Sequence, residues 1–189
     1  MKQLTAYDLS ELSVLIVDDN PHMRYLVRQL LGAFGIRKKQ EAEDGAEALK
    51  CLHSFQADFA ICDWSMSPLD GLEFTKLVRT SEDTQNPFLP IIMLTGYTEL
   101  HRVEEARDAG VDEFLSKPIS ATALYSRIVS VIEKCRPFVK SPTFLGPDRR
   151  RKRGFSPYKG PERRSDVYID DAPPSSLFAK TAIGTHLAS

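Results

Sequence analysis

The sequence predicts a doubly wound α/β domain, with a parallel sheet between two layers of helices, followed by a tail of different composition. Strand-like apolar runs alternate five times with segments of helical spacing, which favours parallel strands joined by right-handed crossovers. The central run, 59–63, is too short for a helix and is closed by Pro and Gly, which indicates a buried parallel strand. A chain of 189 residues with 42% hydrophobic content can bury one sizeable core and carry an appendage.

The first half of the chain predicts three strands and two helices. The strand over 12–17 is apolar on both faces, and the helix over 22–34 has apolar residues at helical spacing. The strand over 36–43 contains three consecutive basic residues, so we expect it at or near an edge of the sheet. A helix over 46–55 then leads to the central strand, 59–63.

The second half repeats the alternation. A polar loop with two prolines separates its first helix from the next strand. The predicted elements are a helix over 72–79, a strand over 91–94, a helix over 98–109, a strand over 113–116 and a helix over 120–135. The predicted domain therefore ends near residue 136, a normal length for a single domain.

Chemically reactive side chains follow four of the five predicted strands. Asp18 and Asp19 come after the first, Asp63 ends the central one, and Thr95 and Lys117 follow the last two. Open α/β sheets bind their ligands at the carboxyl ends of the strands, so we expect these side chains to converge there. Alone, the acid pair could simply begin a helix. Three carboxylates, a hydroxyl and an ammonium at one sheet edge indicate phosphoryl transfer instead.

Charge divides the chain into two parts. Residues 1–136 hold 15 Lys and Arg against 21 Asp and Glu, a net charge of −6. Residues 137–189 hold 10 against 5, a net charge of +5. An acidic body and a basic tail indicate different partners for the two parts.

Cysteine usage and hydropathy indicate the compartment. Cys51, Cys62 and Cys135 are odd in number and lack the Cys-x-x-Cys spacing. They favour free thiols in a reducing cytoplasm over a disulfide framework or a metal site. The N-terminus has no long apolar segment, and no run reaches the length of a membrane span. We therefore expect a soluble, cytoplasmic protein.

The tail, 137–189, differs from the rest of the chain in composition and periodicity. It holds seven of the twelve prolines and shows no sustained periodicity, which predicts a mostly disordered segment. It contains an internal repeat, because Phe144–Arg150 and Tyr158–Arg164 share an aromatic residue, Gly-Pro, an acidic residue and two arginines. Guanidinium groups bind phosphate bidentately and stack on bases. Two interpretations stay open: a passive extension, or an anion-binding segment that uses Arg149, Arg150, Arg163 and Arg164.

The order of the acid pair, the strand-end Asp63, Thr95 and Lys117-Pro118, each after its own strand, resembles a known family. Residues 12–136, about two-thirds of the chain, resemble the CheY-like receiver domain of two-component response regulators. The resemblance implies a flavodoxin-like fold with a five-stranded sheet. It also implies a bacterial signalling protein of the chemotaxis and motility type, phosphorylated on Asp63 by a histidine kinase or phosphotransfer protein. Such a protein is not an enzyme, apart from Mg²⁺-dependent self-phosphorylation from a phosphodonor and autodephosphorylation.

The resemblance also assigns the metal and phosphoryl contacts. Asp18, Asp19, Asp63 and the backbone carbonyl of Ser65 would bind Mg²⁺, a hard cation that prefers oxygen ligands. The metal would relieve the repulsion among the carboxylates and stabilise the transferring phosphoryl group. Lys117 would pair with a phosphoryl oxygen.

A switch follows from the same resemblance. The hydroxyl of Thr95 would be drawn to the phosphoryl group while Phe114 turns inward, and the two would repack the face formed by residues 98–135. A downstream protein would recognise that face, so phosphorylation would shift the population between two packings.

Three function hypotheses follow. The first is a response regulator without a DNA-binding output domain, because residues beyond 136 lack the periodic segments of a helix-turn-helix; no sequence-specific DNA binding is expected. The second is a receiver-gated effector whose arginine-rich tail binds a cyclic dinucleotide such as cyclic di-GMP, or another nucleic acid or anionic ligand. Its arginine motifs resemble those of motility regulators that bind cyclic di-GMP. The third, a haloacid dehalogenase-type hydrolase, needs Asp-x-Asp and is disfavoured by Asp18-Asp19-Asn20.

Overall fold

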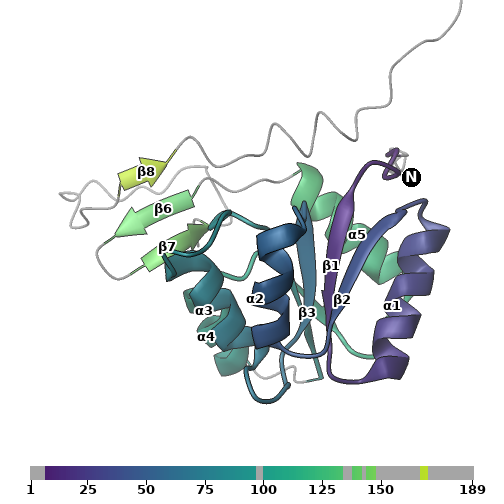
Figure 1. Cartoon of the computed structure of the whole chain (residues 1–189), viewed down its shortest axis with the longest axis horizontal. Helices are drawn as coiled ribbons and strands as arrows, with labels where there is room; N and C mark the ends of the chain where they lie inside the picture. Colours follow the sequence, from purple (N-terminus) through teal and green to yellow (C-terminus); the bar gives the residue numbers. More distant parts are fainter. Residues whose placement is uncertain (1–6, 97–99, 134–137, 142–143, 148–166, 170–189) are drawn as a thin grey trace, which may run out of the picture.

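The computed structural model describes five stretches of the chain, residues 7–96, 100–133, 138–141, 144–147 and 167–169. A five-stranded parallel sheet with strand order β2-β1-β3-β4-β5 forms the centre of the domain (Figure 1). Its strands are β1 (Ser13–Val17), β2 (Lys38–Ala42), β3 (Phe59–Asp63), β4 (Ile91–Thr95) and β5 (Glu113–Ser116). The predicted flavodoxin-like, doubly wound fold is thereby confirmed.

Five helices cover the two faces of the sheet. They are α1 (Pro21–Ala33), α2 (Gly45–Ser54), α3 (Gly71–Thr80), α4 (Leu100–Ala109) and α5 (Ala121–Glu133). Helices α1 and α5 lie on one side of the sheet, and α2, α3 and α4 lie on the other (Figure 1). Every predicted helix is present, with ends that differ from the predicted ones by one or two residues in the described parts.

The alternation of side chains along the strands explains the two layers. In β1, Val14 and Ile16 join the core that contains the apolar faces of α1 and α5. Leu15 and Val17 point the other way, into the core that contains α2 and α3. Both sets are fully buried, as a central parallel strand requires.

Short polar side chains begin three of the helices. Asn20 Oδ1 accepts hydrogen bonds from the backbone N–H groups of His22 and Met23, and Asp44 caps α2 in the same way. Asp70 and Glu73 form a reciprocal capping box at the start of α3. These caps fix the helices that follow the carboxyl ends of β1, β2 and β3.

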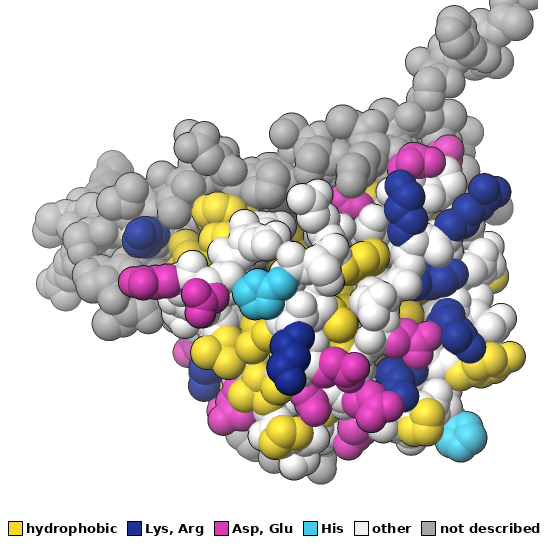
Figure 2. Space-filling view, in the orientation of Figure 1, with side chains coloured by type: hydrophobic (Ala, Val, Ile, Leu, Met, Phe, Trp, Pro, Cys, Tyr) yellow, Lys and Arg dark blue, Asp and Glu magenta, His cyan; other side chains and the backbone are white. Residues whose placement is uncertain are grey.

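Strand β2 lies at the edge of the sheet, as its basic residues predict. Arg24 of α1 pairs with Glu41 and Glu43, and Lys38 pairs with Glu11. Figure 2 shows the resulting mixture of acidic and basic side chains along the α1–β2 edge. Charged side chains on an edge strand discourage pairing with another chain.

The tail contributes three strands that composition did not predict. Strands β6 (Phe138–Ser141), β7 (Phe144–Pro147) and β8 (Val167–Ile169) form a small antiparallel sheet with β6 in the middle. This sheet lies beside α3 and α4 (Figure 1). The arginines of the sequence repeat, Arg149, Arg150, Arg163 and Arg164, lie outside the described residues. Among the residues that the structure describes, no helix is long and apolar enough to cross a membrane.

Candidate functional site

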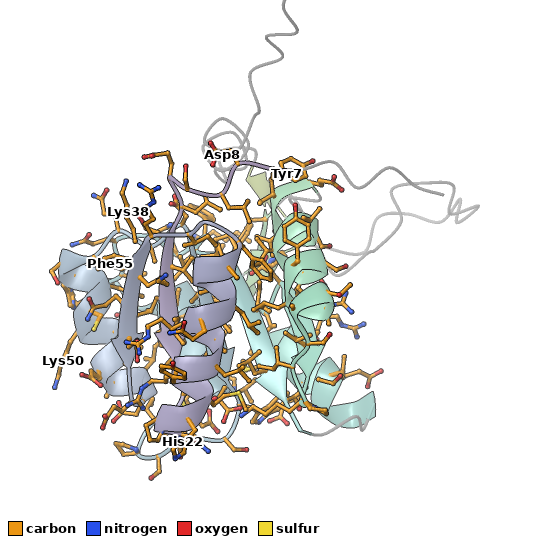
Figure 3. The ribbon with its side chains drawn as sticks, turned by 90° about the vertical axis from the view of Figure 1, so that its right-hand side faces the viewer. Tyr7, Asp8, His22, Lys38, Lys50 and Phe55 are labelled. Carbon is orange, nitrogen blue, oxygen red and sulfur yellow. The ribbon has the colours of Figure 1, made fainter. Side chains whose placement is uncertain are left out.

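The carboxyl edge of the main sheet gathers the side chains that the sequence singled out. Asp18 follows β1, Asp63 ends β3, and Thr95 ends β4. The backbone continues the sheet beyond its last pairs, because Lys117 N–H donates to the carbonyl oxygen of Thr95 at 2.8 Å. His22, at the start of α1, lies at this end of the domain, opposite Tyr7 and Asp8 (Figure 3).

Lys117 forms the centre of the charge arrangement. Its Nζ lies 2.9 Å from Asp63 Oδ1 and 3.2 Å from Asp18 Oδ2. The backbone N–H of Trp64 also donates to Asp63 Oδ1, at 2.8 Å. One carboxylate oxygen of Asp63 therefore accepts two hydrogen bonds that hold the side chain in place.

The three acidic side chains could hold a divalent cation. Oxygen atoms of Asp18, Asp19 and Asp63 lie within 4.8 Å of one another, with Asp18 and Asp63 buried and Asp19 exposed. Asn20 N–H donates to Asp18 Oδ1, and Arg24 donates to the Asp18 carbonyl oxygen at 2.7 Å. Hard oxygen donors with one side open to water suit Mg²⁺. This confirms that the predicted carboxylates come together, whereas the carbonyl of Ser65 stays a predicted ligand.

Burial and neighbouring charge control the ionisation of the site. Burial raises the pKa of Asp63, the charge of Asp18 raises it further, and the hydrogen bond from Lys117 opposes both effects. Burial alone would lower the pKa of Lys117, but its contacts with Asp63 and Asp18 raise it above its ordinary value. The site thus combines an ammonium whose charged form is favoured with a carboxylate whose ionised form a further positive charge would stabilise.

The two predicted switch residues lie on neighbouring strands. Thr95 is buried at the end of β4, and Phe114 of β5 pairs in register with Met93. Phe114 is half-buried and packs against a cluster that includes Trp64 and Ala106 of α4. A change in the rotamer of Phe114 would therefore alter how α4 packs on the sheet. Residues 97–99, at the start of the predicted output face, lie outside the described part of the chain.

The structure adds a residue that sequence reasoning read only as a turn. Gly71 begins α3, and its N–H donates to the carbonyl oxygen of Trp64 at 3.0 Å. A Cβ at this position would collide with the carbonyl oxygen of Asp63. Gly71 thus lets α3 start against the backbone of Asp63. The Asp70-Gly71 pair before an apolar helix was the only signal for it in the sequence.

Comparison with known proteins identifies the family. The chain matches the response regulator receiver domain family over residues 14–129, and it belongs to that family. Chemotaxis protein CheY of Pseudomonas aeruginosa is 35% identical over 123 residues, which cover 65% of this chain and 98% of the relative. Chemotaxis protein CheY-3 of Vibrio cholerae is 34% identical over 123 residues, which cover 65% of this chain and 93% of the relative.

Solved structures agree with this assignment. Chemotaxis protein CheY4 of Vibrio cholerae matches with a TM-score of 0.58 and 32% identity, covering 64% of this chain and 98% of that one. A putative response regulator from Chloroflexus aurantiacus matches with a TM-score of 0.58 and 29% identity, covering 63% and 95%. The chain is therefore a two-component response regulator with a CheY-like receiver domain.

Proposed function

We propose that Asp63 accepts a phosphoryl group from a histidine kinase or phosphotransfer protein, with Mg²⁺ held by Asp18, Asp19, Asp63 and the Ser65 carbonyl. The observation that carries this proposal is the placement of Lys117 between the buried carboxylates of Asp63 and Asp18. A structural ion pair would need one carboxylate; this site has two of them, with the exposed Asp19 beside them. That excess of negative charge favours a cation and a phosphoryl group as ligands.

Asp63 would act as the nucleophile. Its Oδ1 already accepts hydrogen bonds from Lys117 and Trp64, so we assign the attack on phosphorus to Oδ2. The phosphorus–nitrogen bond of the phosphohistidine donor breaks as the acyl phosphate forms, and the donor imidazole leaves with the bonding electron pair. Bound Mg²⁺ would supply charge neutralisation for the carboxylates and the transferring oxygens.

Lys117 and Thr95 would stabilise the product. The raised pKa of Lys117 keeps its ammonium charged over the physiological range, so it can turn from the two carboxylates to a phosphoryl oxygen. The Thr95 hydroxyl would donate a hydrogen bond to another phosphoryl oxygen. Its movement would open space that Phe114 fills, because both residues lie on neighbouring strands beneath α4.

A downstream protein would read the resulting change on the face of α4, β5 and α5. Phosphorylation changes the population of two packings of this face rather than creating a new surface. In this proposal the protein works as a signalling switch, and its only catalytic activities are self-phosphorylation from a phosphodonor and loss of its own phosphoryl group.

A small-molecule phosphodonor tests this proposal. The full chain is incubated with acetyl phosphate and Mg²⁺, and the intact mass is measured. We expect a single phosphoryl adduct that requires Mg²⁺ and is absent in Asp63→Asn. Asp83→Asn, in an exposed loop, serves as the matched acidic control. An adduct of equal yield in Asp63→Asn would disprove the assignment.

A second function is proposed for the tail, namely binding of a cyclic dinucleotide such as cyclic di-GMP, or another phosphate-bearing ligand, by its arginine repeat. One observation favours it. The first repeat begins in β7 and the second ends shortly before β8, and both strands pair with β6. In the sequence, both arginine pairs therefore lie between two strands that pair with the same neighbour.

Calorimetric titration tests the tail. Cyclic di-GMP is titrated into the full chain and into a variant with Arg149, Arg150, Arg163 and Arg164 changed to Ala, at two salt concentrations. We expect saturable binding only to the full chain, weakened by salt because phosphate contacts are electrostatic. Equal binding to both proteins, or none to either, would contradict the proposal.

A further inference from the structure

The tail strand β6 contacts the receiver domain through an aromatic ring on a buried guanidinium. Arg79, near the end of α3, is 2% exposed, and its Cζ lies 5.2 Å from the centroid of the Phe138 ring. The same ring meets Phe88 edge-on, with centroids 5.0 Å apart and an interplanar angle of 84°. Phe138 itself is 3% exposed. The first residue of β6 is therefore a packed part of the receiver, not a tethered extension.

Arg79 joins this contact to the turn between α4 and β5. Its Nε and Nη2 donate to the Gly110 carbonyl oxygen at 3.2 and 2.9 Å, and Nη2 also donates to Asp112 Oδ2 at 3.1 Å. Its Nη1 donates to the Pro87 carbonyl oxygen at 2.9 Å. Every guanidinium nitrogen thus has a partner. These hydrogen bonds fix the orientation of the guanidinium plane, so a movement of this turn would change the surface against which Phe138 packs.

Asp112 extends the connection to two strands of the sheet. Its Oδ2 also accepts a hydrogen bond from Ile91 N–H at 2.8 Å, so the Arg79–Asp112 pair holds the beginnings of both β4 and β5. These are the strands whose carboxyl ends carry Thr95 and Lys117. The proposed switch residue Phe114 lies two positions after Asp112.

We infer that β6 docks on the α4–β5 turn through Phe138 and Arg79, and that this docking is coupled to phosphorylation of the receiver. The coupling to phosphorylation rests on the proposed function; the docking does not. A shift of β5 or α4 moves Gly110 and Asp112, and hence the guanidinium beneath Phe138. The coupling is reciprocal: if phosphorylation changes the docking equilibrium of β6 by some factor, docking or release of β6 changes the switch equilibrium by that factor.

The position of the small sheet supports this inference. Strand β7 contacts both α3 and α4, and the small sheet lies beside these helices in Figure 1. Helix α4 contributes Ala106 and Ala109 to the buried cluster against which Phe114 packs. The tail therefore adjoins the helix that the switch would move, at the end of β4 and β5 away from the phosphoacceptor.

Hydrogen exchange of the full chain tests the docking without any ligand. The variant is Phe138→Ala, and Phe138→Leu keeps most of the apolar volume without the ring. Lys140→Ala, which changes an exposed side chain of the same strand, is the control. Loss of a desolvated ring–guanidinium contact should speed exchange at the backbone N–H groups of Gly110–Asp112 by roughly tenfold in Phe138→Ala, less in Phe138→Leu, and not in Lys140→Ala. Unchanged exchange in Phe138→Ala would overturn the docking, whatever happens at Asp63.

Addition of beryllofluoride and Mg²⁺ then tests the coupling. Protection of the peptide around Asp63 reports loading of the site and thus the proposed function. If the site loads, we expect exchange in residues 138–141 to change in the wild type and to be insensitive to loading in Phe138→Ala. A loaded site with unchanged exchange in 138–141 would overturn the coupling and leave the proposed function standing. Failure to load would contradict the proposed function, while the ligand-free comparison still decides the docking.

Discussion

Among single residues, Lys117 makes the acidic site compatible with a folded domain. Asp18 and Asp63 are both buried, and each has one oxygen on the Lys117 ammonium. Two buried carboxylates without a cation would repel each other and would lack the solvation that they have in the unfolded chain. The ammonium therefore contributes to stability before any phosphoryl group arrives, and it prepares the place that the group would take.

Removing that ammonium should destabilise the domain in a way that Mg²⁺ reverses. We expect Lys117→Ala to lower the free energy of unfolding by about 1–3 kcal/mol, since it leaves charged acceptors buried without their donor. The exposed Lys50→Ala is the control and should change little. Urea unfolding with and without Mg²⁺ measures both effects. A loss of equal size in both variants would contradict the role given to Lys117.

Gly71 sets the backbone geometry of the same site. A Cβ there would meet the Asp63 carbonyl oxygen and would lie 3.0 Å from Met93 Sδ. We expect Gly71→Ala to cost about 1–3 kcal/mol through overpacking and to reduce phosphorylation by acetyl phosphate. Gly32→Ala, whose Cβ would lie 3.5 Å from the flexible end of Lys39, is the matched control. In a helix it should stabilise by about 0.5–1 kcal/mol, so thermal unfolding of the two variants should move in opposite directions.

Among the elements, the described segment before β1 forms hydrogen bonds to α5 through Tyr7. The Tyr7 hydroxyl donates to Glu133 Oε1 at 2.7 Å, and Tyr125 Oη accepts from Tyr7 N–H at 3.5 Å. The ring of Tyr125 packs edge-on against Phe34, the residue that follows the last residue of α1. Tyr7 therefore adds to the packing between the two helices that cover one face of the sheet.

This attachment predicts a dependence on alkaline pH. The hydrogen bond to Glu133 raises the pKa of Tyr7 above 10.0, and burial and the charge of Glu133 add to it. A group whose pKa is raised on folding contributes stability that is complete below 10.0 and is lost as the pH rises through the folded value. The difference between the phenolate absorbance titrations of wild type and Tyr7→Phe should show one tyrosine ionising above pH 10. A difference in absorbance that titrates at or below pH 10 would contradict the hydrogen bond between Tyr7 and Glu133.

The elements also show what a sequence can and cannot predict. Strands β1, β3 and β4 were found because each is a short apolar run, and the reactive residues at their ends were placed together by the parallel topology alone. The contact between Phe138 and Arg79 carried no such signal. It joins residues 59 positions apart that follow no shared period, and the prolines around β6 made the tail resemble a chain without regular structure. Pairings that tertiary packing alone determines leave no local pattern.

In the whole molecule, the two ends of β4 and β5 make different contacts. Their carboxyl ends present Thr95 and Lys117 to the acidic site, and their amino ends are tied to Arg79 and thereby to β6. The sheet thus connects a chemical event at one edge to a packing contact at the other. Mg²⁺ is the simplest ligand with which to test the acidic site separately from the small sheet.

We expect Mg²⁺ to raise the thermal midpoint of the full chain by binding the folded state alone. At a concentration one hundred times the dissociation constant, the gain in unfolding free energy is about 2.7 kcal/mol. Asp18→Asn should abolish the gain, whereas Phe138→Ala should retain it because it changes only the opposite end of the sheet. The raised pKa of Asp63 adds a pH dependence of defined sign, since protons compete with the cation for this carboxylate.

Stabilisation by Mg²⁺ should therefore shrink as the pH falls toward and through the raised pKa of Asp63, which lies above 3.8. Without the metal, the native state binds the proton more tightly than the unfolded chain, so Asp63 destabilises the fold increasingly as the pH rises through the same range. Asp63→Asn should accordingly be insensitive to both effects. Calorimetric melts of the wild type and of Asp63→Asn from pH 4 to pH 7, with Mg²⁺ or with a chelator, measure both effects. A metal effect that grows toward low pH would contradict the assignment of Asp63 as a ligand.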